Sequence, residues 1–344
     1  MRNCKSRNVV LFLSASVTLL LFVANIFFGS VDIPFADVFD ILVGGEPRYE
    51  SWRLILLQSR LPQAVVALFC GMSLSAAGLM LQTLFNNPLA GPEVFGINSG
   101  AGLGVAVVML LLQGTFVAGS MTVGGYMAVL MGAFLGAILT IGIILLFSTL
   151  LRGNIFLLIA GMSLSYLTSS VISLLNYFST AEGVHSYLIW GMGNFGGVSL
   201  QQLPLFVTFA CVALGFSLLM MKPLNALLLG NSYAANLGVK TKRVRALLLV
   251  LTGFLTAVVT AYCGPITFVG LAVPHIARLL LGTNNHRILL PVAILLGGAT
   301  TLLCNIICQL PGESGLVPLG AVTPLLGAPV ILYVVLKNRG VYSS

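Results

Sequence analysis

The chain has 344 residues, of which 58% are hydrophobic and only 7% are charged, and its formal net charge is +8. Soluble domains carry about 25% charged residues, so this chain lacks the polar surface that a water-soluble protein needs. Apolar runs recur along nearly its whole length and leave no room for a separate soluble domain. The composition therefore predicts an all-α integral membrane protein in which residues 1–344 form a single transmembrane domain.

Ten apolar segments predict about ten transmembrane helices, since a helix needs roughly 20 apolar residues to cross a bilayer. In chain order they are 9–29, 62–84, 95–113, 122–150, 154–176, 202–222, 245–263, 270–282, 287–308 and 319–336. The eighth is too short to span alone, and we expect it to be broken or to include residues 264–269. The first is longer than a signal-peptide core, so we expect a retained span.

The distribution of charge predicts the orientation of these spans. Thirteen of the 16 Lys and Arg residues fall on the side of the N-terminus, and seven of the eight acidic residues fall on the other side. Cytoplasmic loops carry an excess of Lys and Arg. We therefore expect both termini in the cytoplasm, and we interpret the basic charge as a topology signal rather than a nucleic-acid surface.

Two loops are larger than simple connections. The outer loop, 30–60, holds an amphipathic stretch that we expect to lie on the membrane surface or beneath a partner. The inner loop, about 223–244, holds two short helices separated by Gly230, with Asn231 or Ser232 capping the second and Gly238 ending it. Such a pair suits docking into the groove of another protein, and an ordinary interfacial loop is the alternative.

Glycine and proline mark the contacts and the breaks of the bundle. Gly96, Gly100 and Gly104 lie four residues apart, as do Gly132 and Gly136, which predicts close helix packing within the chain or between copies. Segments 86–96 and 264–278 combine Gly, Pro and polar residues, and such broken backbone needs protein or a cavity around it. Their similarity suggests an inverted repeat of helices 2–5 and 7–10.

No catalytic, metal or cofactor site is evident. The three His residues are scattered, and we expect the six Cys residues to be unpaired and, within the apolar runs, buried. Val239 separates Gly238 from Lys240, so a nucleotide-binding loop is excluded there. We predict that the chain is not an enzyme, and that any ATP hydrolysis occurs in a separate subunit.

Ionisable side chains are nearly absent from the predicted spans, whereas a secondary transporter usually keeps one at mid-membrane. The polar residues there are neutral, and they either line a pathway or hydrogen-bond within the bundle. They are Gln82, Asn98, Ser163, Ser165, Thr168, Ser169, Asn176 and Asn305.

Motifs between about residues 55 and 337 resemble the iron-siderophore, haem and cobalamin permeases of ABC importers. They begin with Arg60-Leu61-Pro62, Gly71, Gly78, Gln82, Asn87-Pro88-Leu89-Ala90 and Ser99-Gly100-Ala101. They continue with Leu237-Gly238-Val239, Gly264-Pro265-Ile266, Val273-Pro274-His275-Ile276-Ala277-Arg278, Pro318-Leu319-Gly320 and Gly327-Ala328-Pro329.

The resemblance implies a homodimer in the bacterial inner membrane that works with two cytoplasmic ATPase subunits and a periplasmic substrate-binding protein. It implies ATPase coupling through Asn231, Ser232, Tyr233, Ala234, Asn236, Leu237 and Gly238. It implies a translocation path and gate at Asn154, Ile155, Ser163, Tyr166, Thr168 and Ser169, with the gate in the turn that starts at Gly153. Binding-protein docking is implied for Arg60, with Arg53 or Arg48 supplementing it. The supplement is expected because Gln63 stands where cobalamin permeases carry Arg, and Gln309 stands where relatives carry a late periplasmic Arg.

The substrate is expected to be a ferric siderophore, with haem or cobalamin as alternatives of the same family. Alternatives of other classes are a stand-alone secondary transporter, a membrane-embedded enzyme and a channel. The missing membrane carboxylates argue against the first and the missing catalytic cluster against the second.

Overall fold

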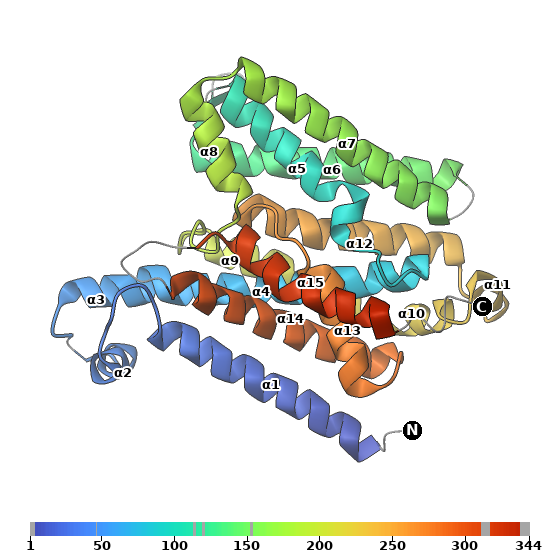
Figure 1. Cartoon of the computed structure of the whole chain (residues 1–344), viewed down its shortest axis with the longest axis horizontal. Coiled ribbons are helices and arrows are strands. Elements are labelled where there is room, and N and C mark those ends of the chain that lie inside the picture. The colour runs from blue at the N-terminus through green and yellow to red at the C-terminus, as the bar shows by residue number, and fades with distance from the viewer. Residues whose placement is uncertain are drawn as a thin grey trace.

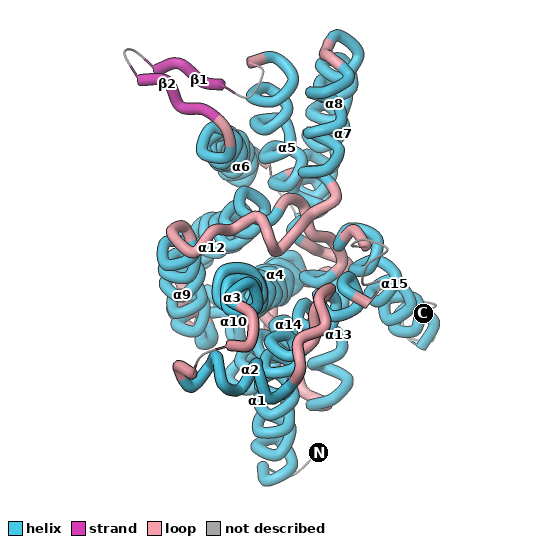
Figure 2. The backbone as a smooth tube through the Cα atoms, turned by 90° about the vertical axis from the view of Figure 1, so that its left-hand side faces the viewer, coloured by secondary structure: helices cyan, strands magenta, loops and turns pink. Residues whose placement is uncertain are grey.

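The computed structural model describes residues 4–45, 47–112, 115–118, 121–151, 154–310 and 317–337. Long helices run along one axis of the molecule (Figure 1), and an end-on view places α4 near the centre of the bundle (Figure 2). The predicted fold class, an all-α membrane protein, is confirmed. The elements are α1 (Cys4–Phe27), α2 (Phe35–Val43), α3 (Glu50–Leu54), η1 (Ile55–Arg60), α4 (Leu61–Phe85), η2 (Pro92–Phe95), α5 (Ile97–Ala106), η3 (Val107–Leu111), β1 (Thr115–Ala118), β2 (Met121–Gly124), α6 (Tyr126–Leu150), α7 (Asn154–Phe178), α8 (Ala181–Gly191), α9 (Leu203–Leu219), α10 (Met221–Leu227), α11 (Asn231–Asn236), α12 (Thr241–Cys263), α13 (Val269–Leu281), α14 (His286–Gln309) and α15 (Leu319–Lys337).

Each of the ten predicted segments is largely helical, but the helices differ in length. Six of the described helices are long and apolar enough to cross a membrane, and α9 with α10 forms a seventh candidate bent by 50°. The helices beginning at Ile97, Val269 and Leu319 are shorter apolar helices. A count of ten complete spans therefore stays a prediction.

Three local structures differ from the sequence prediction. The segment predicted as a helix from residue 122 begins instead as β2, which pairs with β1 in a short antiparallel hairpin. The segment predicted from residue 95 begins at Ile97, after a 3-10 turn and a left-handed Gly96 with φ of 71°. Helix α8 was not predicted, because its 11 residues mix Glu, His and Ser with apolar residues.

Small residues allow α4 to pack at the centre of the bundle. A Cβ atom at Gly71 would overlap the carbonyl oxygen of Gly297 in α14. Beside it, the Ser75 hydroxyl donates to the Ala293 carbonyl at 2.8 Å, and the Thr301 hydroxyl donates to the Ala67 carbonyl at 2.6 Å. Lipid is as apolar as a Leu side chain, so close backbone contact and hydrogen bonds must hold membrane helices together.

The glycines predicted to form close contacts do so within the chain. Gly104 and Gly132 bring α5 against α6, and so do Gly100 and Gly136. A Cβ at any of the four would come within 3 Å of backbone or side-chain atoms of the facing helix. Contact between copies is therefore not needed to explain this spacing.

The two broken segments lie against each other. Gly96 and Phe268 both adopt left-handed backbone conformations directly before a helix. The backbone amide of Phe268 hydrogen-bonds the Glu93 carboxyl, and a Cβ at Gly270 would lie 2.9 Å from the Pro92 ring. Protein thus surrounds both breaks, as broken backbone in a membrane requires. The inverted repeat itself stays a prediction.

Four of the six cysteines are buried and free, as expected: Cys70, Cys263, Cys304 and Cys308. Cys211 is also free but exposed on α9, which corrects the prediction of burial there. The Cys4 side chain lies outside the described part of the chain. Cys70 and Cys263 meet across α4 and α12 with their sulfur atoms 3.2 Å apart, a contact that their positions in the sequence do not reveal.

Candidate functional site

Helix α7 has one packed face and one open face. Leu157 is fully buried, and a Cβ at Gly161 would lie 2.7 Å from the Val94 carbonyl oxygen, so this side packs on η2. The opposite side is open: Tyr166 is 76% exposed and Tyr177 is 82% exposed. Figure 2 shows α7 at the edge of the molecule, where a second protein or lipid could meet its open face.

The predicted path residues divide between these two faces. Ile155, Ser163, Tyr166 and Ser169 are exposed. Thr168 is only 7% exposed, and its hydroxyl donates to the Leu164 and Ser165 carbonyls of its own helix. The structure therefore gives Thr168 a place in the packed face rather than on the open one.

The gate prediction lies at the start of the same helix. Gly153 lies outside the described residues, and Asn154 begins α7 with only its backbone described. The exposed side chain of Ile155 follows directly. The predicted gate therefore coincides with the first turn of the helix whose open face carries Ser163, Tyr166 and Ser169.

The open face also carries polar residues that the sequence analysis did not select. Ser170, Ser173 and Tyr177 are exposed, and they follow Tyr166 at intervals of three or four residues. Such intervals keep side chains on one side of a helix. The spacing could have identified them, because they extend the series that begins at Ser163 and Tyr166.

The predicted coupling residues form a short helix that projects from the bundle beside α10 (Figure 1). Gly230, with φ of 96°, is the N-cap of α11, so the prediction of capping by Asn231 or Ser232 is wrong; both lie inside the helix. Gly238 follows the helix with φ of 84°, which agrees with its predicted role as the end.

Of the seven predicted coupling residues, which lie in α11 and the two positions after it, only one is buried. Ala234 is fully buried and anchors the helix, whereas Tyr233 is 55% exposed and Leu237 is 58% exposed. Tyr233 and Leu237 are four residues apart, which places two large side chains on one side of the turn. Asn231, Ser232, Asn236 and Gly238 are exposed around them.

A hydrogen-bond network joins α10 to the transmembrane helices. The Asn225 side-chain oxygen accepts a hydrogen bond from the His286 backbone amide at 2.8 Å and lies 3.1 Å from its ring Nδ1. The other ring nitrogen, Nε2, lies 2.8 Å from the Thr83 hydroxyl of α4. The Asn225 amide also donates to the Asn285 side-chain oxygen at 3.0 Å. A movement of α10 would therefore act directly on the ends of α4 and α14.

The three arginines predicted for docking differ in exposure. Arg48 and Arg53 are exposed, but Arg60 is 4% exposed. Its guanidinium donates to the carbonyls of Ile26, Phe27 and Val31 and so binds the end of α1. A docking role for Arg60 stays untested, and the structure gives its side chain a role inside the chain.

The two glutamines that entered the docking prediction, Gln63 and Gln309, lie together. The Gln309 side-chain amide donates to the Gln63 side-chain oxygen at 3.1 Å. Both line a pocket of about 170 Å³ with Asn194 and Asn305. None of the described residues that line this pocket is charged.

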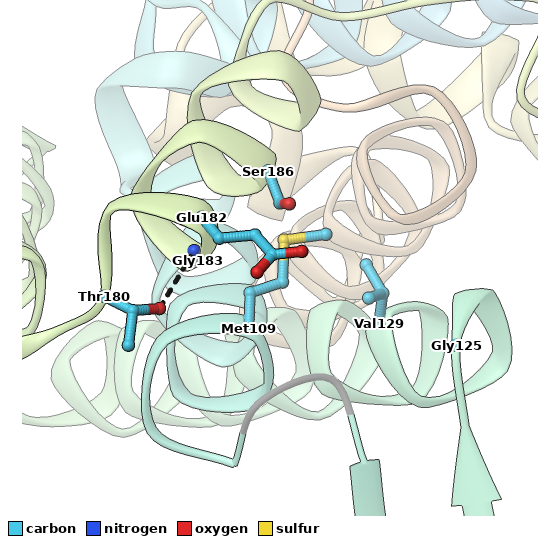
Figure 3. Close-up of a pocket in the computed structure, with 7 residues that line it drawn as sticks. All are labelled: Met109, Gly125, Val129, Thr180, Glu182, Gly183 and Ser186. Carbon is cyan, nitrogen blue, oxygen red and sulfur yellow. Dashed lines mark hydrogen bonds between the residues drawn. The ribbon is translucent and has the colours of Figure 1, made fainter.

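A second pocket, of about 520 Å³, opens beside α8 (Figure 3). Figure 3 shows the Glu182 carboxylate and the Met109 side chain close together in it. The Thr180 hydroxyl accepts a hydrogen bond from the Gly183 backbone amide at 3.2 Å and caps α8. The described residues contain no group of three or more His, Cys, Asp or Glu side chains that could hold a metal ion.

Comparison with known proteins shows which sequences and structures this chain is similar to. The model of the FecCD transport family matches residues 17–337. The vitamin B12 import system permease protein BtuC of Klebsiella pneumoniae is 38% identical over 296 residues, which cover 86% of each chain. That of Citrobacter koseri is 37% identical and covers 83% of this chain and 84% of its own.

Solved structures show the same architecture. An inward-facing metal-chelate type ABC transporter superposes with a TM-score of 0.83 at 28% identity, covering 96% of this chain and 99% of that one. A PsaBC structure from Streptococcus pneumoniae has a TM-score of 0.52 at 17% identity and is similar in fold alone.

Proposed function

Because this chain belongs to the FecCD transport family, we propose that it forms the path by which an ABC importer moves cobalamin across the bacterial inner membrane. The chain is a multi-pass transport permease of that membrane and not itself an enzyme. What carries the choice of substrate is the 38% identity to a vitamin B12 permease over 86% of both chains.

Cobalamin replaces the expected ferric siderophore as the proposed substrate because of this similarity to vitamin B12 permeases. Eight relatives named as vitamin B12 permeases are 36–38% identical to this chain. The metal-chelate transporter is more distant, at 28% identity, and leaves a ferric chelate as the second candidate. The family consists of ABC permeases, so the stand-alone secondary transporter is set aside.

The proposed path lies between two copies of the chain. The open face of α7 carries Ser163, Tyr166, Ser169 and Ser173 among large apolar residues. Such a mixture suits a large amphipathic ligand that must pass without binding tightly, since hydroxyl groups offer hydrogen bonds without fixed charge. A second copy facing this side would complete a channel that one chain leaves open.

The proposed energy source is a pair of cytoplasmic ATPase subunits that bind α11. Closure of the ATPase pair would push α10 and α11, and the Asn225–His286 contact would pass that movement to α14 and α4. The two copies would then rock so that the path opens to one side at a time. Both termini are placed in the cytoplasm by this proposal.

On the opposite face, a periplasmic binding protein would dock against the exposed Arg48 and Arg53. Arg60 would support this surface from below by holding the end of α1.

Uptake of labelled cobalamin, ferric siderophores and haem by a deletion strain and its complemented parent tests the substrate. Loss of cobalamin uptake alone, restored by the gene, is the expected result. Loss of ferric siderophore uptake with normal cobalamin uptake would overturn the cobalamin assignment and leave the permease assignment in place.

A further inference from the structure

An apolar groove runs along the outside of the bundle between α9 and α12. Its volume is about 300 Å³. All of the residues that line it are apolar, and most are exposed. They are Val212, Ala213, Phe216, Met220, Leu247, Val250, Leu251 and Phe254.

The groove fits within one leaflet of a bilayer. Its lining extends from Leu247 to Phe254 on α12, a rise of about 10 Å at 1.5 Å per residue. One leaflet of hydrocarbon is about 15 Å thick. Figure 2 places α9 and α12 on the side of the bundle away from α7, so a copy that faces α7 would leave the groove open to lipid.

Positive side chains lie at one end of the groove. Arg243 is exposed and precedes Leu247 by four residues, which puts it on the same side of α12, one turn further out. Lys222 is exposed at the start of α10, two residues after the lining residue Met220 and past the 50° bend that separates α10 from α9. Lys242 is exposed beside them.

The segment of sequence that carries these cations holds no acidic residue. The sequence contains no Asp or Glu between Glu182 and Glu313. The first turn of α12 has no acidic residue, and its N-cap, Lys240, makes no side-chain capping bond. The positive end of the helix dipole adds to the charge of these cations, so an anion is the partner that this helix end lacks.

Arg245 shows that the arrangement is specific to one side of α12. Two residues beyond Arg243, it points to the other side of the helix, where its guanidinium lies 5.8 Å from the centre of the Phe85 ring. The cations near the groove have no such aromatic contact among the described residues.

We propose that this groove binds an anionic phospholipid of the cytoplasmic leaflet, with one acyl chain against Phe216 and Val250 and the phosphate between Lys222 and Arg243. The choice of leaflet rests on the orientation proposed above, whereas the chemistry of the site does not. Because Lys222 belongs to α10, the lipid would bind next to the helix that meets the ATPase.

The test is lipid retention by the purified full-length chain in detergent, titrated with phosphatidylglycerol or phosphatidylcholine and followed by native mass spectrometry. Tighter retention of phosphatidylglycerol is expected. Removing two cations near a lipid phosphate, each contributing about 1 kcal/mol, should weaken its binding about 30-fold in the K222Q/R243Q variant. Val250→Trp should fill the groove and displace both lipids.

Two controls distinguish this site from general contact with lipid. Arg287 is an exposed cation at the start of α14, and Leu139 is an exposed apolar residue of α6. Arg287→Gln and Leu139→Trp should leave retention unchanged. Equal retention of the two lipids, or equal losses in the control and groove variants, would overturn the site. Cobalamin uptake does not enter the measurement, so failure here leaves the proposed function standing.

Discussion

Asn225 and His286 are 61 positions apart in the sequence, yet the side chain of the first hydrogen-bonds both the backbone amide and the ring of the second. Asn225 lies in α10, outside the long spans, and His286 begins α14. His286 is 1% exposed, and its ring continues the contact to Thr83 of α4. This pair therefore forms a polar link between the proposed coupling region and the centre of the bundle.

Asn225→Ala should lower the amount of substrate transported per ATP hydrolysed in the reconstituted complex. The change removes the acceptor from a buried amide, which costs about 1–3 kcal/mol locally and loosens α10 from α14. The exposed neighbour Asn284→Ala is the matched control and should keep the wild-type ratio. An unchanged ratio in Asn225→Ala would show that the network does not transmit coupling.

Gly238→Pro and Tyr233→Arg should uncouple ATP hydrolysis from transport while the chain remains folded. Gly238 has φ of 84°, which proline cannot adopt, and its amide donates to the Ala235 carbonyl at 2.9 Å. Tyr233→Arg replaces an exposed aromatic ring by a charge in the proposed docking surface. Gly238→Asn should be milder, since Asn tolerates this conformation. Normal ATP-driven transport in both variants would exclude α11 as the docking element.

Substitutions of Arg60 and Arg53 should affect different properties: the first should lower the thermal stability of the chain, and the second should weaken docking of the binding protein. Arg60→Gln removes charged hydrogen bonds to the end of α1, each of which contributes about 1.5–3 kcal/mol, and should lower the thermal unfolding midpoint. Arg53→Gln should leave that midpoint unchanged and weaken association with the binding protein. If Arg60→Gln unfolds at the wild-type temperature, the buried guanidinium does not stabilise the α1 end.

Gly78→Ala should reduce folding yield far more than Gly142→Ala, a substitution at an uncrowded glycine of α6. A Cβ at Gly78 would overlap the Gly270 carbonyl and force α4 away from α13, and such overpacking costs about 1–3 kcal/mol or more. Gly142→Ala is the control, because no atom lies within 4 Å of a Cβ there. It should stabilise α6 by about 0.5–1 kcal/mol. Monodisperse yield after size-exclusion chromatography measures both.

Labelling of introduced cysteines should show which face of α7 is accessible and which is packed. A membrane-impermeant maleimide should label Tyr166→Cys in the assembled transporter, and bound substrate should slow the reaction. Thr168→Cys should resist labelling, since that position is 7% exposed against the neighbouring turn. Both variants need a background without the native thiols, of which Cys211 is exposed. Equal labelling at both positions would contradict the assignment of faces.

The sequence alone determined the class of the protein and the place of most helices. In a bilayer every backbone polar group must form its hydrogen bond within the protein, and a long apolar run achieves this by forming a helix. Hydropathy alone is therefore enough to locate such a helix. The glycine spacing at Gly100 and Gly104 likewise predicted close packing, because small residues are what membrane helices need at their contacts. Hydropathy did not predict helix α8, because the helix is short and mixes polar with apolar residues. It did not predict the hairpin either, because each of its strands is only four residues long.

Only the tertiary structure decided which side chains face where. Lipid and protein interior are equally apolar, so the pattern of α7 could not tell Thr168, which is packed, from Tyr166, which is exposed. The resemblance implied a docking role for Arg60, but its guanidinium lies inside the chain, where it donates to three carbonyls around the end of α1. The contact between Asn225 and His286 forms only when two helices that are distant in the sequence pack together. The local sequence around either residue therefore does not predict it.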